Sequence, residues 1–152
     1  MYKTNKQYEL SDDRSRIDGD FVHRELSKSY WAEAIPREFT DKSIANSLCF
    51  GIYSNGTQVA FARVISDYAT FGYLCDVIVT DEHRGAGLGK WIMEAVMEHP
   101  ELQSLRRFML ATLDAHTLYT RFGFQPPKNP DRLLEIVKPG MYKEMRAQKG
   151  NT

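Results

Sequence analysis

The sequence predicts a mixed α+β domain, in which helices cover both faces of a central sheet. Residues 48–66 form two β-rich runs around Asn55-Gly56, and this dipeptide is the strongest short-range signal of a hairpin. Residues 71–113 then read as strand, glycine-rich loop, helix and strand, which is the pattern of a parallel crossover. Antiparallel hairpins followed by one such crossover indicate a mixed, mostly antiparallel sheet.

The N-terminal half begins with a short predicted strand and two predicted helices. The strand is "YELSDD", residues 8–13. Residues 21–31 have a loosely shared apolar face, and Asp20 precedes them as an N-cap. Residues 34–47 form the second helix, which the chain enters through Pro36.

The C-terminal half alternates strands and helices. Residues 71–80 carry apolar side chains on both parities, which indicates a central strand covered on both faces. An amphipathic helix starts at Leu88 and ends near His99-Pro100. Residues 106–113 are the next strand, 114–122 a short helix, and "RLLEIVK", 132–138, a late strand.

Length, charge and composition limit the classes of function that this chain can have. At 152 residues the chain predicts a single domain, 1–152, with a core of about residues 8–138. Its formal net charge of zero offers no global attraction for nucleic acid or an acidic membrane. The polar N-terminus lacks the apolar stretch of a signal peptide, and Cys49 and Cys75 form no CxxC pair. We expect a cytoplasmic protein with no metal site.

The stretch "DEHRGAGLGKW", residues 81–91, opens the amphipathic helix with three alternating glycines. Bare backbone N–H groups at a helix N-terminus attract phosphate. A dinucleotide fingerprint requires GxGxxG, but the sixth position from Gly85 is Lys90. A P-loop requires Ser or Thr after GK, but Trp91 stands there. The remaining readings are a different phosphate clamp or a tight turn that uses glycine for backbone freedom.

Two motifs together identify a family resemblance. Arg84, Gly87 and Gly89 match the pyrophosphate motif [Gln/Arg]-x-x-Gly-x-[Gly/Ala] of the GNAT superfamily of acyl-CoA N-acyltransferases, after the strand "DVIV". "AHTLYTRFGF" matches its second signature, Ala-x-x-x-Tyr-x-x-x-Gly-Phe, through Ala115, Tyr119 and Gly123-Phe124. The sequence therefore resembles that superfamily from about residue 50 to 124. One departure is Thr112, where many members carry a cofactor-contacting Asn.

The resemblance implies a GNAT fold whose parallel strands splay apart, with acetyl-CoA (coenzyme A) in the gap. The pantetheine arm would add to the edge of the strand as an extra strand does, and the glycine loop would hold the pyrophosphate. The cofactor-binding residues that we expect on this basis are Val77, Ile78, Val79, Arg84, Gly85, Ala86, Gly87, Leu88, Gly89, Lys90, Asp114 and Tyr119.

Direct attack of an amine on the thioester needs a neutral amine, oxyanion stabilisation and a proton for the thiolate. By resemblance Tyr119 is the acid, and a backbone N–H of residues 77–79 is the oxyanion donor; the alternative for Tyr119 is a core tyrosine. Asp76 is the candidate base, or else a buried partner of Arg63 or a backbone amide. Asp114 and His116 are rival bases, although Asp114 is better placed to cap the helix at 114–122.

The acceptor site is expected in the N-terminal half and the hairpin loops. Tyr30 and Trp31 form either an aromatic wall or part of the core, and Arg63 and Asp67 are polar candidates near the aromatic loop at 66–73. The predicted function is N-acetylation of a small primary amine in a ternary complex. A protein or peptide N-acetyltransferase and a non-catalytic acetyl-CoA-binding regulatory module are the alternatives, and the resemblance allows a homodimer.

Overall fold

The computed structural model describes residues 2–5 and 7–150, and its centre is one six-stranded sheet. The strands lie in chain order, and all neighbours are antiparallel except β5 and β6, which are parallel. The fold class predicted from the sequence is thus confirmed. The strand bounds are β1 Tyr2–Asn5, β2 Tyr8–Ser11, β3 Leu48–Ser54, β4 Thr57–Ser66, β5 Phe71–Val79 and β6 Arg107–Leu110.

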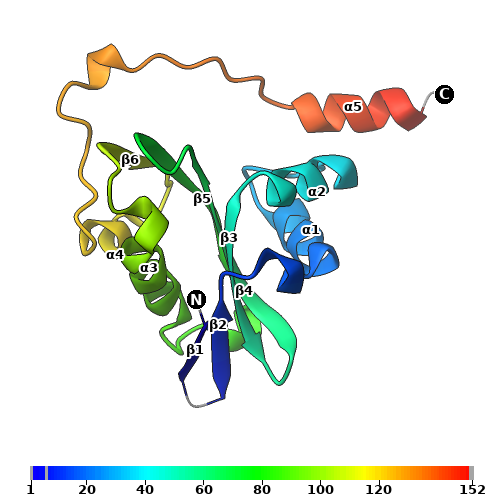
Figure 1. Ribbon diagram of the computed structural model, residues 1–152. Coiled ribbons are helices and arrows are strands. Elements are labelled where there is room, and N and C mark those ends of the chain that lie inside the picture. The colour runs from blue at the N-terminus through cyan, green and yellow to red at the C-terminus, as the bar shows by residue number, and fades with distance from the viewer. Residues whose placement is uncertain (1, 6, 151–152) are drawn as a thin grey trace.

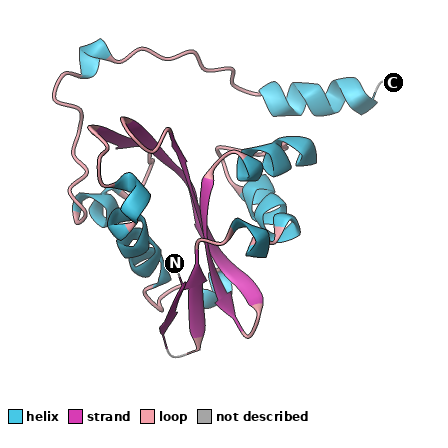
Figure 2. Cartoon of the chain, in the orientation of Figure 1, coloured by secondary structure: helices cyan, strands magenta, loops and turns pink. Residues whose placement is uncertain are grey.

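Helices cover both faces of the sheet (Figure 1 and Figure 2). One face carries α1 (Gly19–Lys28) and α2 (Arg37–Ala45), and the other carries α3 (Leu88–Glu98) and α4 (His116–Thr120). A fifth helix, α5 (Met141–Gly150), lies beyond α2 at the end of a long extended segment. Short 3₁₀ turns lie at Arg14–Arg16, Asp81–His83, Pro100–Leu102 and Pro130–Arg132.

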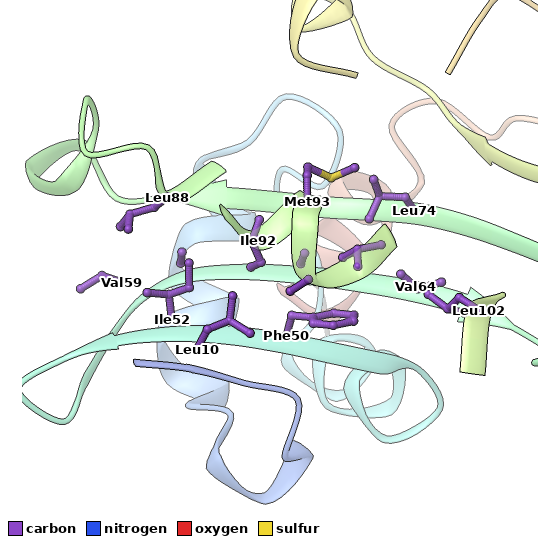
Figure 3. Close-up of a cluster of buried hydrophobic side chains, with 14 residues drawn as sticks. Leu10, Phe50, Ile52, Val59, Val64, Leu74, Leu88, Ile92, Met93 and Leu102 are labelled. Atoms are coloured by element: carbon purple, nitrogen blue, oxygen red, sulfur yellow. The ribbon is translucent and has the colours of Figure 1, made fainter. Parts of the chain in front are cut away.

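Each face of the sheet has its own buried cluster. On the α3 side, Ile92 and Met93 pack over the strands against side chains such as Phe50 (Figure 3). On the α1 side, Phe21 and Leu26 pack with Phe61 of β4 and Ile78 of β5. The central strands therefore bury side chains of both parities, which is the reason for the continuous apolar run predicted for β5.

The hairpin predicted around Asn55-Gly56 is confirmed. It joins β3 and β4, with Ser54 paired to Thr57, and both turn residues have positive φ, 50° for Asn55 and 81° for Gly56. Positive φ at both central residues is the requirement of the type I′ turn that matches the twist of the strands.

The predictions for the first strand and the first helix need correction. The strand at 8–13 is β2, but an additional strand, β1, pairs with it and was not predicted. Helix α1 ends at Lys28, before Tyr30 and Trp31, and its N-cap is Asp18 rather than Asp20. The Asp18 carboxylate accepts hydrogen bonds from the backbone N–H groups of Asp20 and Phe21, at 3.0 and 3.1 Å. The helix thus begins earlier than its apolar pattern.

The late strand predicted at 132–138 is wrong. Arg132 closes a 3₁₀ turn, and the following residues are extended without pairing to any described strand. Leu134 is 96% exposed and Ile136 is 92% exposed. Across the described residues, helices of the length and apolar character needed to cross a bilayer are absent.

Replacing Asp18 with Ala removes both cap hydrogen bonds of α1. We expect the free energy of unfolding to fall by about 1 kcal/mol, the usual cost of losing an N-cap, as measured by urea denaturation. Asp20→Ala is the control, because it removes a carboxylate from the same turn, together with an exposed ion pair to Arg37 that contributes little, and leaves the cap in place. An equal loss in both variants would contradict the assignment of Asp18 as the cap.

Candidate active site

The glycine loop turns the chain from β5 into α3 by means of left-handed backbone. Gly85 and Gly87 have φ of 83° and 77°, and Gly87 is the N-cap of α3. No side chain caps this helix, and its first turn contains no acidic residue. The first N–H groups of a helix have no intrahelical partner, so this terminus is suited to receive an anion.

Gly89 distinguishes the phosphate-clamp interpretation of the loop from the tight-turn interpretation. The tight-turn reading explains Gly85 and Gly87, whose φ values disfavour a side chain. Gly89 lies inside the first turn of α3 without a positive φ, and an added Cβ would contact only Leu118 Cδ2, at 3.9 Å. Because glycine costs a helix about 1 kcal/mol relative to alanine, the folded chain alone does not account for Gly89. The backbone at Gly89 is open on the side where a side chain would stand.

The charged residues of the loop are exposed and only weakly engaged. Arg84 lies 3.1 Å from Asp81 with 71% of its side chain exposed, and Lys90 lies 3.9 Å from Glu94. Surface ion pairs of this kind contribute little, so both cations are able to turn toward a phosphate. Thr80, which precedes the loop, has a buried hydroxyl without a hydrogen-bond partner in the described part of the chain.

The second half of β5 has a free edge. Only Phe71–Leu74 of β5 pairs with β6. Beyond Leu74, β4 is the one described strand that hydrogen-bonds to β5. The register with β4 shifts at this point, so that Asp76 and Val77 together oppose Ala62. Asp76 has a φ of 55°, as expected for a β-bulge that bends its strand. The edge residues predicted to meet the cofactor, Val77–Val79, thus follow the bulge directly.

Asp76 is the centre of a buried polar network. Its Oδ2 accepts a hydrogen bond from Arg63 Nε at 2.8 Å, and its Oδ1 accepts one from Trp31 Nε1 at 2.8 Å. Burial alone would lower the pKa of Arg63, but the Asp76 carboxylate raises it. Arg63 also donates to Ser47 Oγ at 3.0 Å. The pairing with Arg63 considered from the sequence is therefore present, while the role of Asp76 as base stays a prediction.

Tyr119 projects from α4, on the face of the sheet that also carries α3. Its ring packs on Phe124, with centroids 6.3 Å apart, at the edge of the core. Burial raises the pKa of its phenol, and the nearby Asp114 and Tyr30 raise it further. Tyr30 follows α1, on the other face of the sheet.

Asp114 does not cap α4, contrary to the prediction. The N-cap of this helix is Ala115, and no side chain caps it. Thr112 Oγ1 instead accepts a hydrogen bond from the N–H of Ala115 at 3.0 Å, which gives a structural role to the residue that departs from the family pattern. Asp114 and His116 are both exposed, and neither lies in the network around Asp76.

Tyr30 and Trp31 are a wall rather than part of the core. They are 63% and 46% exposed, and their rings meet edge to face with centroids 5.0 Å apart. The Trp31 indole connects this wall to the bulge through Asp76. Asp67, by contrast, accepts hydrogen bonds from the N–H groups of residues 69, 70 and 71 and from the Thr70 hydroxyl. These contacts hold the pKa of Asp67 well below its usual range and favour a role in shaping the loop rather than in binding a substrate.

Sequence reasoning missed two residues of this region. Ser47 supports Arg63, but a lone serine before a strand carries no recognisable signal. Tyr73, on β5, lies close enough to Asp76 for the carboxylate to contribute, after burial and Cys75, to raising the pKa of its phenol. The aromatic loop at 66–73 did indicate this surface, although not the particular residue.

Comparison with known proteins identifies the family of the chain. The model of the acetyltransferase (GNAT) family matches residues 13–124. The chain belongs to the GNAT family of acetyltransferases. GNAT enzymes use acetyl-CoA as their co-substrate, and the match extends further toward the N-terminus than the two motifs alone.

Individual relatives support the same assignment. A candidate acetyltransferase of Gibberella zeae is 34% identical over 139 residues, covering 76% of this chain and 77% of its own length. The crystal structure of a candidate GNAT acetyltransferase from Xanthomonas campestris pv. campestris is 55% identical, with a TM-score of 0.87, and the match covers 89% of this chain and 96% of that one. A Clostridium acetobutylicum acetyltransferase crystallised with acetyl-CoA shares the fold at 15% identity and a TM-score of 0.62, over 90% and 96% of the two chains.

The Arg63–Asp76 pair allows a direct test of the network in this GNAT enzyme. Removing one partner of a buried ion pair typically costs about 3–5 kcal/mol, because the other charge stays buried. We expect Arg63→Met and Asp76→Asn each to lower the free energy of unfolding by about 3 kcal/mol, measured in urea. In the double variant the free energy of unfolding should fall by markedly less than the sum of the two single losses, since no unpaired charge remains. Strict additivity would show that the two groups do not interact.

Proposed function

We propose that this protein transfers an acetyl group from acetyl-CoA to the primary amine of a small molecule, by direct attack in a ternary complex. The observation that carries the proposal is the bulged edge of β5, which no described strand pairs beyond Leu74 on the β6 side and which leads into the glycine loop. The donor and the acceptor would approach this edge from different sides.

The donor side is formed by the loop and by the edge of β5. Leu88, Gly89 and Lys90 offer backbone N–H groups to the pyrophosphate, with Arg84 supplying charge. Residues 77–79 offer backbone groups to the pantetheine arm as an edge strand does. The buried Thr80 hydroxyl without a partner and the open space beside Gly89 fit such a ligand.

The thioester supplies an activated carbonyl, and the chain supplies proton handling around it. Asp76 retains one lone pair on each carboxylate oxygen after bonding Arg63 and Trp31, so it is able to take the amine proton through a water. A backbone N–H of residues 77–79 stabilises the oxyanion. As the N–C bond forms and the C–S bond breaks, the Tyr119 phenol gives its proton to the departing thiolate.

The exposed aromatic pair favours a small acceptor over an extended peptide. Tyr30 and Trp31 stand over the bulge, and Trp31 is held there by its hydrogen bond to Asp76. A wall fixed in this position narrows the approach to β5. A peptide acceptor is the second candidate, and the regulatory module is the third; a panel of small amines and peptides in a thiol-release assay separates them.

Gly89→Ala tests the donor side without harming the fold. The new Cβ meets only Leu118, at 3.9 Å, and alanine favours the helix, so stability should be unchanged or higher by up to about 1 kcal/mol. The methyl group would nevertheless stand where the anion must approach the backbone. We expect the Kd for CoA to rise about tenfold, equivalent to about 1.4 kcal/mol, measured by calorimetry. Gly150→Ala, in α5, is the matched control.

Unchanged CoA affinity in Gly89→Ala would remove the loop from the donor site. If the wild-type protein shows no thermal shift with acetyl-CoA or CoA at millimolar concentration, the proposal itself fails, because a ligand that binds only the folded state must stabilise it.

Tyr119→Phe tests the acid. We expect kcat to fall by about 10²-fold or more, the usual contribution of general acid catalysis, with little change in the KM for acetyl-CoA. Because burial raises the pKa of this phenol above the ordinary value for tyrosine, the phenol keeps its proton at neutral pH. The wild-type kcat should therefore not decline from loss of this proton as the pH rises through neutrality. Tyr53→Phe, which removes a hydroxyl bonded to the Arg16 carbonyl, is the control.

A kcat of Tyr119→Phe within twofold of wild type would mean that another group protonates the thiolate. Binding of acetyl-CoA with no turnover over the amine and peptide panels, in wild type and variant alike, would favour the regulatory module instead.

A further inference from the structure

Three neighbouring strands carry a row of apolar side chains on the face of the sheet that bears α1 and α2. Ile65 of β4 pairs with Tyr73 of β5, and Tyr73 pairs with Met109 of β6. Along each strand, the adjacent residues pack in the cluster under α3, so these three side chains point to the other face. Phe71 of β5 has the same parity as Tyr73 and extends the row. We call these four residues the floor.

The buried cluster beneath α1 and α2 does not include the floor. It contains Phe61 and Ile78, which pair with each other further along β4 and β5. Ile65 is 44% exposed and Phe71 is 39% exposed, while the other two residues of the floor are half-buried. Single exposed apolar side chains are common, but a contiguous apolar patch indicates a binding surface.

The C-terminal part of the chain leaves the floor open as well. Leu134 and Ile136 are almost fully exposed, so they do not cover it. Helix α5 is held against α2 instead, where the rings of Tyr142 and Phe39 meet with centroids 5.9 Å apart. Glu135 is exposed in the same segment, and a charge that stays in water contributes little to binding.

The floor is continuous with the bulge at Asp76. Cys75 lies between Tyr73 and Asp76, on the same face, and burial raises the pKa of its thiol to about 12, so the thiol is neutral. At about 3.3 Å per residue, Tyr73 begins within about 10 Å of Asp76. The indole of Trp31 is bonded to Asp76, and the ring of Tyr30 meets it edge to face. The aromatic wall therefore stands beside the end of the floor where the β5 edge becomes free.

The charges on these strands suit an acceptor with a single amine. β4, β5 and β6 contain three charged residues, Arg63, Asp76 and Arg107. Asp76 is the carboxylate among them, and Arg63 is bonded to it. Arg107 pairs with Phe71 at the far end of the floor and is exposed. One ammonium group would thus meet a carboxylate at Asp76, whereas a second would meet apolar side chains and a guanidinium.

We propose that the acceptor is a primary monoamine on an aliphatic or aromatic body, which lies on the floor with its amine at Asp76. This inference rests on the proposed acetyl transfer and names the class of its acceptor. Burial of the apolar body against the floor and the wall supplies the binding free energy. Polyamines and amino sugars are poor acceptors, because they set polar groups against apolar side chains that cannot bond them. The products are the N-acetylated amine and CoA, and the proton lost by the amine balances the one gained by the thiolate.

Three amines with the same six-carbon chain test the class in a thiol-release assay. Hexylamine, 1,6-diaminohexane and 6-aminohexanoate differ only at the far end, which is a methyl, an ammonium or a carboxylate group. We expect kcat/KM for hexylamine to exceed the other two values by about tenfold or more, because only its far end is apolar. Methylamine, which has no body to bury, should be an equally poor acceptor.

Ile65→Glu tests the place of the body. The new carboxylate would stand on the floor, so kcat/KM should fall for hexylamine and rise for 1,6-diaminohexane. We expect the ratio of the two values to change by about tenfold or more. Since both amines are measured on one preparation, partial loss of folding cancels from the ratio. Thr57→Glu, at the exposed opposite end of β4, is the matched control and should leave the ratio unchanged.

The outcomes separate this inference from the proposed function. Thiol release that is as fast with the diamine or with 6-aminohexanoate as with hexylamine would overturn the acceptor class and leave acetyl transfer in place. A ratio that Ile65→Glu does not change would do the same. If CoA binds but none of these amines releases thiol, the acceptor class and the proposed small-amine transfer fall together.

Discussion

Beyond Leu74, β5 keeps a single hydrogen-bonded neighbour, and the arrangement of the site depends on this parting from β6. Two residues of β5 oppose one residue of β4 at the bulge, and the strand bends there. The bend exposes backbone polar groups in the middle of a sheet, where they are normally paired. By our proposal, a ligand that hydrogen-bonds like a strand would satisfy them, and the glycine loop that follows would hold the charged end of the same ligand.

A buried ion pair lies at the bulge and connects it to Trp31. Asp76 adopts a positive φ in the middle of a strand, and its carboxylate is held by Arg63 from β4 and by Trp31 from the segment after α1. Buried charges are costly unless both are paired with good geometry, and here both hydrogen bonds measure 2.8 Å. One carboxylate thus ties the backbone shape of the donor site to the position of the aromatic wall.

The parts that the sequence predicted well are those that depend on local chemistry. The Asn55-Gly56 turn and the helix after the glycine loop follow from neighbouring residues, so their positions were predictable. The parallel crossover followed from the order of strand, loop, helix and strand, and the family resemblance added the splaying of the parallel pair. Asp18 was missed as a cap because the helix begins before its apolar face does, and Asp114 was wrongly assigned because α4 begins one residue later, with Ala115 as its N-cap.

Contacts that arise only in three dimensions were not predictable. Nothing adjacent to Trp31 in the chain indicates that its indole meets a carboxylate 45 positions away. The late strand at 132–138 has the correct pattern for a sheet but lies outside the sheet of its own chain. Its apolar side chains describe what the segment can bury, whereas the location of the burying surface is a property of the folded molecule.

Amide hydrogen exchange with and without CoA, followed residue by residue by NMR, tests the central claim most directly. If the free edge of β5 and the loop hold the donor, the backbone N–H groups at residues 77–79 and 88–90 will gain protection together on addition of CoA, while those of the hairpin at 54–57 will not change. Protection confined to other segments, or none at 77–79 despite saturating CoA, would contradict the account.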